Sequence, residues 1–210
     1  MQAASSRMGT GKPASSERLA GPPSPALEWL WSYLADVRRP HILHCGPVRW
    51  GMMDLLLRRN VKLYLGDAIS PLLNDNARFW DQKGKTPVFK LGEFMAEFPP
   101  VPPGTLTAAF CWQLFDLLPV GLVPEVIERL MSLISPGGVL FFMLREPSLQ
   151  TGADAQWGIE GLKVIVSTRV SDRPYPNPVV TSREIEKAVP PGSLKVYLTR
   201  SGRREIIARK

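Results

Sequence analysis

Short apolar runs alternate with segments of helical periodicity along most of the chain. Residues 41–45 and 61–65 are apolar runs that stop at Gly46-Pro47 and at Gly66-Asp67, as is typical of buried strands that end in turns. Residues 50–59 carry a broad apolar face between these runs and are expected to be helical. The pattern predicts a strand–loop–helix–strand unit of about 27 residues, the size of a parallel crossover.

The same alternation continues toward the C-terminus. Further strands are predicted at 88–91, 106–112, 139–144 and 162–166, helices at 67–81, 123–134 and 182–188, and a terminal hairpin at 194–199 and 204–208. A proline-rich loop is expected at 93–103. Strands that alternate with helices indicate a mainly parallel sheet covered on both faces.

The first residues have a different composition from the rest. Residues 1–24 are rich in Ser, Gly, Ala and Pro and show no hydrophobic period, which predicts a disordered tail ahead of one domain at 25–210. Ser24 is the expected N-cap of a first helix. No apolar run approaches the roughly 20 residues of a membrane span, and the N-terminus lacks the apolar core of a signal peptide. We therefore expect a cytoplasmic protein without a membrane partner.

Three local segments add chemical information to this pattern. The first is Ile42-Leu43-His44-Cys45-Gly46-Pro47-Val48-Arg49-Trp50-Gly51, an apolar strand followed by a turn that contains glycine. The second is Asp67, 21 residues after Gly46 at the tip of the next strand. The third is the run 106–119, an apolar strand with a polar and aromatic tip, followed by a helix and by Pro136-Gly137-Gly138 before another apolar strand.

Together these segments resemble the class I (Rossmann-like) S-adenosylmethionine-dependent methyltransferase family over residues 25–210. The resemblance implies a three-layer, doubly wound α/β fold. Its sheet would be mostly parallel and seven-stranded, with a C-terminal antiparallel strand. It also implies S-adenosylmethionine as the cofactor. In the family, the loop glycines leave room for the ligand and adopt a positive φ.

The glycine motif is degenerate. Gly46 matches the first glycine of the family's loop, Val48 and Trp50 replace the other two, and His44 stands where the family usually has an acid. By resemblance, Asp67 would bind the ribose hydroxyls, while Glu93 and Phe94 would contact adenine. The implied cofactor-binding residues are His44, Gly46, Pro47, Val48, Asp67, Ala68, Glu93, Phe94, Cys111 and Trp112.

Several of these residues also have structural interpretations. Asp67 suits the N-cap of the helix that follows it, and Trp112 suits a core aromatic. Gln113 and Asp116 could cap the next segment. The two cysteines, Cys45 and Cys111, lie in apolar runs and are expected to be reduced, buried thiols. His41 and His44 alone make a poor metal site, so no metal is expected.

The chain carries a net charge of +7, and its end is strongly basic. Between 195 and 210, only Glu205 opposes the cations Lys195, Arg200, Arg203, Arg204, Arg209 and Lys210. Such a cluster predicts contact with phosphate-bearing or nucleic-acid partners. Alternatively, the cations protect the edge of a sheet from pairing with another chain.

Three functions agree with the sequence. The first is methyl transfer from S-adenosylmethionine to an acceptor of unidentified class. No catalytic residue is predicted, because in-line displacement at a sulfonium depends mainly on positioning and desolvation. The second is a methyltransferase-fold scaffold or interaction subunit that has lost the cofactor, which Val48, Trp50 and His44 motivate. The third is another Rossmann-type nucleotide enzyme, although a full Gly-x-Gly-x-x-Gly motif is lacking.

Overall fold

The central sheet of the protein has six strands in the order β10–β11–β7–β6–β2–β3. The computed structural model describes residues 18–81, 86–168, 172–200 and 202–210. The six strands are β2 (His41–His44), β3 (Lys62–Leu65), β6 (Leu106–Phe110), β7 (Ile134–Arg145), β10 (Leu194–Leu198) and β11 (Arg203–Arg209). β3, β2, β6 and β7 are mutually parallel, and β11 runs antiparallel to both of its neighbours. The mostly parallel sheet and its antiparallel last strand confirm the sequence prediction.

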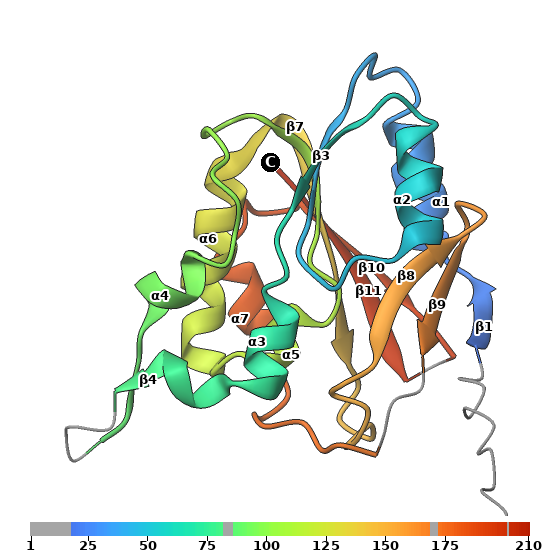
Figure 1. The fold of residues 1–210 in the computed structure, drawn as a ribbon. Helices are drawn as coiled ribbons and strands as arrows, with labels where there is room; N and C mark the ends of the chain where they lie inside the picture. Colours follow the sequence, from blue (N-terminus) through green and yellow to red (C-terminus); the bar gives the residue numbers. More distant parts are fainter. Residues whose placement is uncertain (1–17, 82–85, 169–171, 201) are drawn as a thin grey trace, which may run out of the picture.

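Helices lie on both sides of this sheet (Figure 1). α1 (Pro25–Tyr33) and α2 (Trp50–Leu57) are on one side, and α6 (Val123–Leu133) and α7 (Ser182–Glu186) are on the other. α6 buries the apolar face that its sequence predicts, including Val126, Ile127 and Leu130. The remaining helical elements are α3 (Ile69–Asn74), the 3-10 helices η1 (Asn76–Phe79) and η2 (Val120–Leu122), α4 (Leu91–Met95) and α5 (Leu114–Leu117). In the described ranges, no helix has the length and apolar character needed to cross a membrane.

The strand predicted at 88–91 lies outside the central sheet. In the part of the chain described, this sheet therefore has six strands, where seven were expected. Among the described residues, β5 (Val88–Phe89) pairs with β4 (Trp80–Asp81) in a separate two-stranded sheet. The physical reason is a local aromatic cluster, because Phe89 packs against Phe79, Trp80 and Phe94. The expected loop at 93–103 accordingly begins within α4.

The expected tail at 1–24 also needs correction. β1 (Arg18–Pro23) pairs antiparallel with β9 (Val164–Thr168), which in turn pairs with β8 (Gln156–Glu160). Composition predicted disorder because this strand is held by backbone pairing and not by an apolar pattern. Residues 1–17 of the predicted tail lie outside the described residues.

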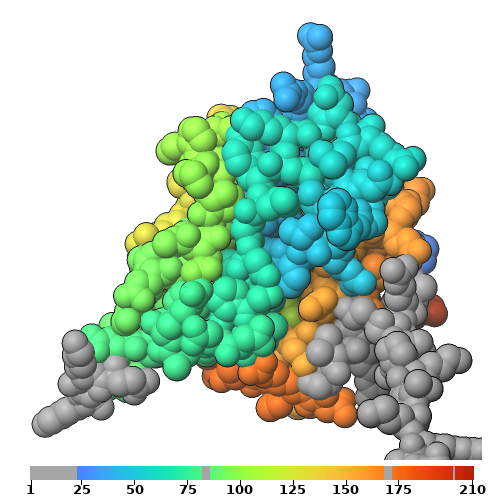
Figure 2. All heavy atoms as spheres, in the orientation of Figure 1, coloured from blue at the N-terminus to red at the C-terminus, as the bar shows by residue number. Residues whose placement is uncertain are grey.

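In Figure 2, the orange surface of β8 and β9 borders the blue and cyan surface of residues 40–65.

Ser24 joins this small sheet to the domain. Its backbone N–H donates to Lys163 O at 2.6 Å, and its hydroxyl donates to Glu205 Oε2 at 2.6 Å. The same hydroxyl oxygen accepts from the Leu27 N–H at 3.0 Å, so Ser24 is the N-cap that the sequence predicts for α1. Burial raises the pKa of Glu205, and the Ser24 bond opposes that shift.

Replacing Ser24 by alanine should therefore destabilise the fold. We expect Ser24→Ala to lower the free energy of unfolding by roughly 1–3 kcal/mol, because it removes a helix cap and a partner of a buried carboxylate. Urea denaturation measures the change. Ser32→Ala is the matched control, since the Ser32 hydroxyl bonds only to Glu28 O of the same helix at an exposed site. Equal stability of the two variants would contradict the role given to Ser24.

Candidate functional site

Three strand ends meet at one edge of the central sheet. β2 pairs with β3 on one side and with β6 on the other, and His44 is in register with both Leu65 and Phe110. The chain leaves β2 toward β3 and leaves β6 toward β7, in opposite directions along the sheet. Ligands of open α/β sheets bind at such a switch point, beyond the carboxyl ends of the strands. The residues just after β2, β3 and β6 therefore form the candidate site.

His44 and Trp112 are hydrogen-bonded to each other across this edge. The indole Nε1–H of Trp112 donates to His44 Nδ1 at 3.0 Å, and His44 Nε2 lies 3.2 Å from Pro47 O. Because Nδ1 accepts a bond, the proton of a neutral imidazole sits on Nε2 and faces the Pro47 carbonyl. Burial lowers the pKa of His44, while the Pro47 bond and the Asp67 charge oppose that shift. His44 thus fixes the orientation of the indole.

Trp112 explains why a glycine occupies position 46. A Cβ on Gly46 would lie 3.2 Å from Cδ1 of the fully buried Trp112 ring and 3.3 Å from Cδ1 of Ile69. The resemblance implied a positive φ at Gly46. This expectation is wrong, because Gly46 is not among the residues of the described chain that have positive φ. Trp112 itself has φ of +48°, and its carbonyl accepts the Met143 N–H at 2.7 Å. Close packing of the indole, and not backbone conformation, therefore constrains this position, because a Cβ here would need its neighbours to shift by a few tenths of an ångström.

The two cysteines lie side by side behind this contact. Cys45 Sγ and Cys111 Sγ are 3.5 Å apart and fully buried, and neither forms a disulfide. Burial raises the pKa of the Cys45 thiol well above its ordinary value, and the contact with Cys111 raises it further. Cys111 therefore belongs to the packed hydrophobic core.

Asp67 caps the helix that follows it. Its Oδ1 accepts from the backbone N–H groups of Ile69 at 3.2 Å and Ser70 at 2.9 Å. The side chain is half-buried, and the next residue, Ala68, is fully buried. The alternative role that the sequence suggested for Asp67, capping of the next helix, is thus present. Both capping bonds use the same carboxylate oxygen. Ribose binding by Asp67 stays a prediction.

The residues assigned to adenine by resemblance lie in different surroundings. Glu93 pairs with Lys90 at 3.2 Å, and its side chain is 58% exposed. Phe94 is fully buried, with its ring packed against Phe79 and Phe98. Its ring is therefore part of the aromatic core of the 79–98 segment. The sequence could not reveal this packing, because β5 was expected to be a strand of the central sheet.

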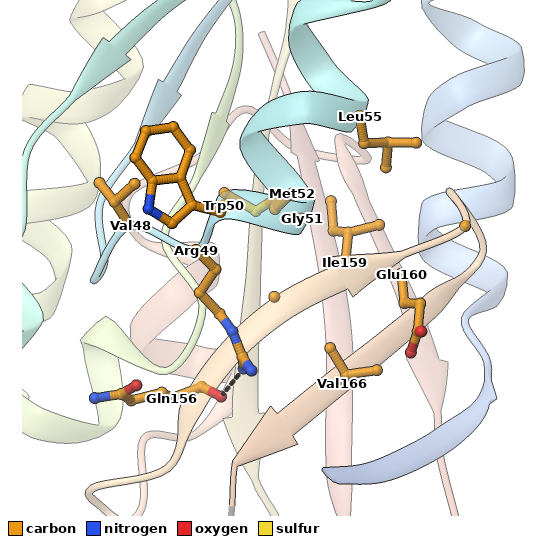
Figure 3. Close-up of a pocket in the computed structure, with 12 residues that line it drawn as sticks. Val48, Arg49, Trp50, Gly51, Met52, Leu55, Gln156, Ile159, Glu160 and Val166 are labelled. Atoms are coloured by element: carbon orange, nitrogen blue, oxygen red, sulfur yellow. Dashed lines mark hydrogen bonds between the residues drawn. The ribbon is translucent and has the colours of Figure 1, made fainter.

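Val48 and Trp50 point outward instead of filling the space beside Gly46. Val48 is 51% exposed and Trp50 is 87% exposed. Both line a cavity of about 460 Å³ between the start of α2 and the β8–β9 hairpin (Figure 3). The lining residues contributed by the hairpin, among them Ile159 and Glu160, were missed from the sequence because β8 was not predicted.

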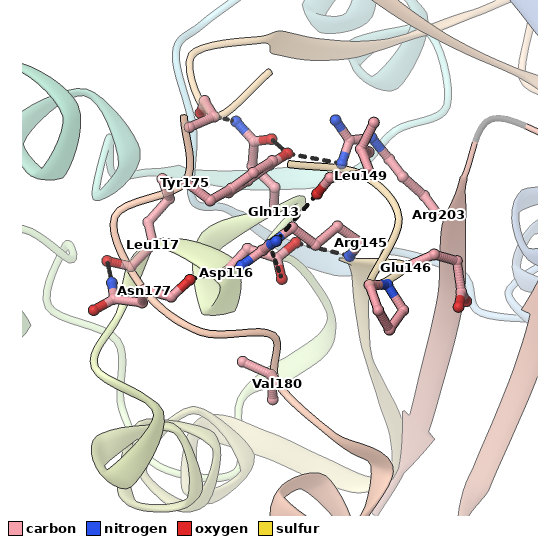
Figure 4. Close-up of polar contacts among 12 residues, drawn as sticks. Gln113, Asp116, Leu117, Arg145, Glu146, Leu149, Tyr175, Asn177, Val180 and Arg203 are labelled. Atoms are coloured by element: carbon pink, nitrogen blue, oxygen red, sulfur yellow. Dashed lines mark hydrogen bonds and ion pairs between the residues drawn. The ribbon is translucent and has the colours of Figure 1, made fainter. Parts of the chain in front are cut away.

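A buried polar network lies beyond the end of β6 (Figure 4). Gln113 Nε2 donates to Ala153 O at 2.5 Å, and Gln113 Oε1 accepts from the Tyr175 hydroxyl at 3.2 Å. Asp116 Oδ2 accepts the Arg145 N–H at 2.9 Å. Gln113 and Asp116 thus hold the segments after β7 and β9 in place, a larger role than the local caps that the sequence suggested.

The basic C-terminus is largely engaged within the fold. Arg203 is buried and donates to the Tyr175 hydroxyl at 2.8 Å, and Arg204 pairs with Glu146 at 3.0 Å. The ammonium of Lys210 donates to Ile134 O at 2.8 Å. Arg203 and Arg204 lie on β11, an interior strand of the sheet, so they do not protect a sheet edge as the alternative interpretation expected. Contact with phosphate-bearing or nucleic-acid partners stays a prediction.

The comparisons with known proteins find similarity at the level of structure. No family model and no curated protein matches the chain. A solved structure of Burkholderia thailandensis 1,6-didemethyltoxoflavin-N1-methyltransferase with bound S-adenosylhomocysteine is similar at 12% identity and a TM-score of 0.46, over 89% of this chain and 76% of that one. A SAM-dependent methyltransferase from Methanosarcina mazei is similar at 12% identity and a TM-score of 0.48, over 87% and 96%.

A third similar structure is an S-adenosylmethionine-dependent methyltransferase from Mesorhizobium loti. It shares 13% identity with this chain at a TM-score of 0.45, over 89% of this chain and 96% of that one. The fold of this chain is defined by its own strand order, with four parallel strands and an antiparallel last strand.

Asp116 predicts a pH dependence of stability. Burial raises the pKa of Asp116 from 3.8 to about 6, against the opposing effects of the Arg145 N–H and of the Arg203, Arg145 and Arg204 charges. The unfolded chain ionises first, so the stability contributed by the protonated carboxyl is lost as pH rises from about 4 to 6. We expect the stability of the wild type relative to Asp116→Asn to fall by roughly 2 kcal/mol over that interval.

Urea denaturation at a series of pH values measures this difference. Asp54→Asn is the control, because Asp54 is an exposed partner of Arg58. A flat difference between the wild type and Asp116→Asn would contradict the raised pKa.

Proposed function

We propose that this chain binds S-adenosylmethionine at the ends of β2, β3 and β6 and supports transfer of its methyl group to an acceptor. The observation that carries the proposal is the placement of Asp67. Its half-buried carboxylate follows β3, next to the loop that follows β2 at the switch point of the sheet. The two capping bonds use Oδ1, which leaves Oδ2 to accept from a ribose hydroxyl.

In this proposal the protein positions the reactants and excludes water. The bound sulfonium supplies an electrophilic methyl group, so the reaction needs no proton transfer by the protein to activate the donor. Asp67 would hold the ribose end, while the backbone of residues 46–48 would lie beside the methionine end. His44 is buried and bonded to Trp112, so it serves to position the indole.

One specific contact favours a second function, a scaffold with the same fold and no cofactor. The Trp112 indole lies against Gly46, in the space that the family's loop keeps open for its ligand. His44 and Met143 both hold Trp112 in this place. Val48 and Trp50, which motivated this alternative from the sequence, do not contribute to it because they point outward.

Titration calorimetry with S-adenosylhomocysteine separates the two functions. We expect saturable heat with the wild type and at least a tenfold weaker affinity with Asp67→Ala. Asp67→Asn should also weaken binding while preserving the cap of α3, since asparagine caps helices about as well as aspartate. Asp75→Ala is the control, because Asp75 lies after α3 and is an exposed partner of Arg78.

The outcome decides between the candidates. If the folded wild type gives no heat at millimolar ligand, the methyltransferase proposal is wrong and the scaffold is favoured. If Asp67→Asn and Asp75→Ala bind as the wild type does, the ligand does not depend on the Asp67 charge and the proposed ribose contact is wrong.

A further inference from the structure

Exposed apolar side chains gather at the start of α2. Trp50 and Val48 are among the large hydrophobic residues with exposed side chains, and Trp50 is 87% exposed. An exposed indole at the rim of a concave surface offers a flat apolar face to a ligand. These residues follow Gly46 by only two and four positions, so the concave surface adjoins the candidate cofactor site.

The cavity beside Trp50 has two walls that are tied together. α2 contributes the buried Met52, and the hairpin contributes the buried Ile159 and Val166. Arg49 Nη1 donates to Gln156 O at 3.0 Å, which bridges the walls (Figure 3). A Cβ on Gly158 would lie 2.9 Å from Arg49 Cδ, so the glycine allows the arginine to cross the strand.

The volume and charge of the cavity limit what it can bind. Its volume of about 460 Å³ lies in the range of sites for small molecules. The described lining carries one cation, Arg49, and one carboxylate, Glu160, whose charges balance. In Figure 3, Trp50 and Val48 lie at one end and Ile159, Glu160 and Val166 at the other. An aromatic ring can pack against the exposed indole face and the apolar walls.

We propose that this cavity binds a small, planar aromatic molecule without net charge, and that this molecule is the methyl acceptor. The assignment as acceptor rests on the proposed methyl transfer, whereas the binding itself does not. The acceptor would thus be selected by the hairpin after β7 and the start of α2, two segments that lie beside the loop after β2.

The test uses the fluorescence of N-phenyl-1-naphthylamine, a neutral aromatic probe, titrated with the full chain. Gly51→Leu should block the cavity without harming the fold, because Gly51 lines it and a Cβ there meets no atom within 4 Å. Trp50→Ala removes the exposed ring. Gly92→Leu is the matched control, since Gly92 is also helical, has the same open space and lies in α4.

We expect saturable binding to the wild type and to Gly92→Leu, and at least fivefold weaker binding to Gly51→Leu and Trp50→Ala. Equal binding to all four proteins, or no saturable binding to the wild type, would overturn the inference. The anionic 8-anilinonaphthalene-1-sulfonate should bind no more than fivefold tighter than the neutral probe, and a larger preference would overturn the assignment of a neutral ligand. If the probe binds as expected while S-adenosylhomocysteine gives no heat, the site stands and the proposed methyl transfer fails.

Discussion

The arrangement of the candidate site depends on the parallel pairing of β2 with both β3 and β6. This pairing puts His44 level with Leu65 and Phe110. Gly46, Asp67 and Trp112 each follow one of these three positions by two residues. The connections after β2 and after β6 run in opposite directions along the sheet, which leaves the edge between them free of a covering crossover. A register shift of one residue would turn the strand side chains to the opposite face of the sheet.

Trp112 is the residue through which this edge is packed. Trp112 has φ of +48°, an uncommon backbone conformation for a residue other than glycine. Such a conformation costs of order 1 kcal/mol and persists only where the surroundings enforce it. Here the bonds from Met143 to its carbonyl and from its indole to His44 hold it. Gly46 then allows the ring to approach the loop. A glycine that resembles the remnant of a cofactor motif thus has a structural reason of its own, which is why Asp67 carries more of the functional argument.

The sequence predicted the parts of the fold that depend on local pattern. The apolar runs before Gly46 and Gly66 are β2 and β3, and the periodic segment at 123–134 is α6. The placement of Asp67 at the tip of β3 also followed from its spacing to Gly46. The sequence failed where long-range pairing decides. β1 has no apolar alternation and forms only because β9 offers an edge, while Phe89 satisfies its burial in a local aromatic cluster and not in the central sheet. Phe94 packs in the same cluster as Phe89, so its surroundings could not be predicted from the sequence either.

β8, which the sequence missed, supplies most of the hairpin's share of the cavity wall, and β9, which matches the strand predicted at 162–166, pairs with it. β8 and β9 lie between β7 and α7, outside the central sheet, and β1 completes their small sheet. Ser24 connects that sheet to α1 and β11 through Lys163, Leu27 and Glu205. The wall of the cavity formed by the hairpin is therefore anchored at two places. Ser24 connects its sheet to β11, and Arg49 connects it to the loop after β2. The hairpin lies outside the parallel sheet, so its side chains can differ without disturbing the strand pairing that places Asp67. Under the proposed methyl transfer, this division explains physically why the spacing from Gly46 to Asp67 would inform about the cofactor, while the acceptor would be selected by residues outside any motif.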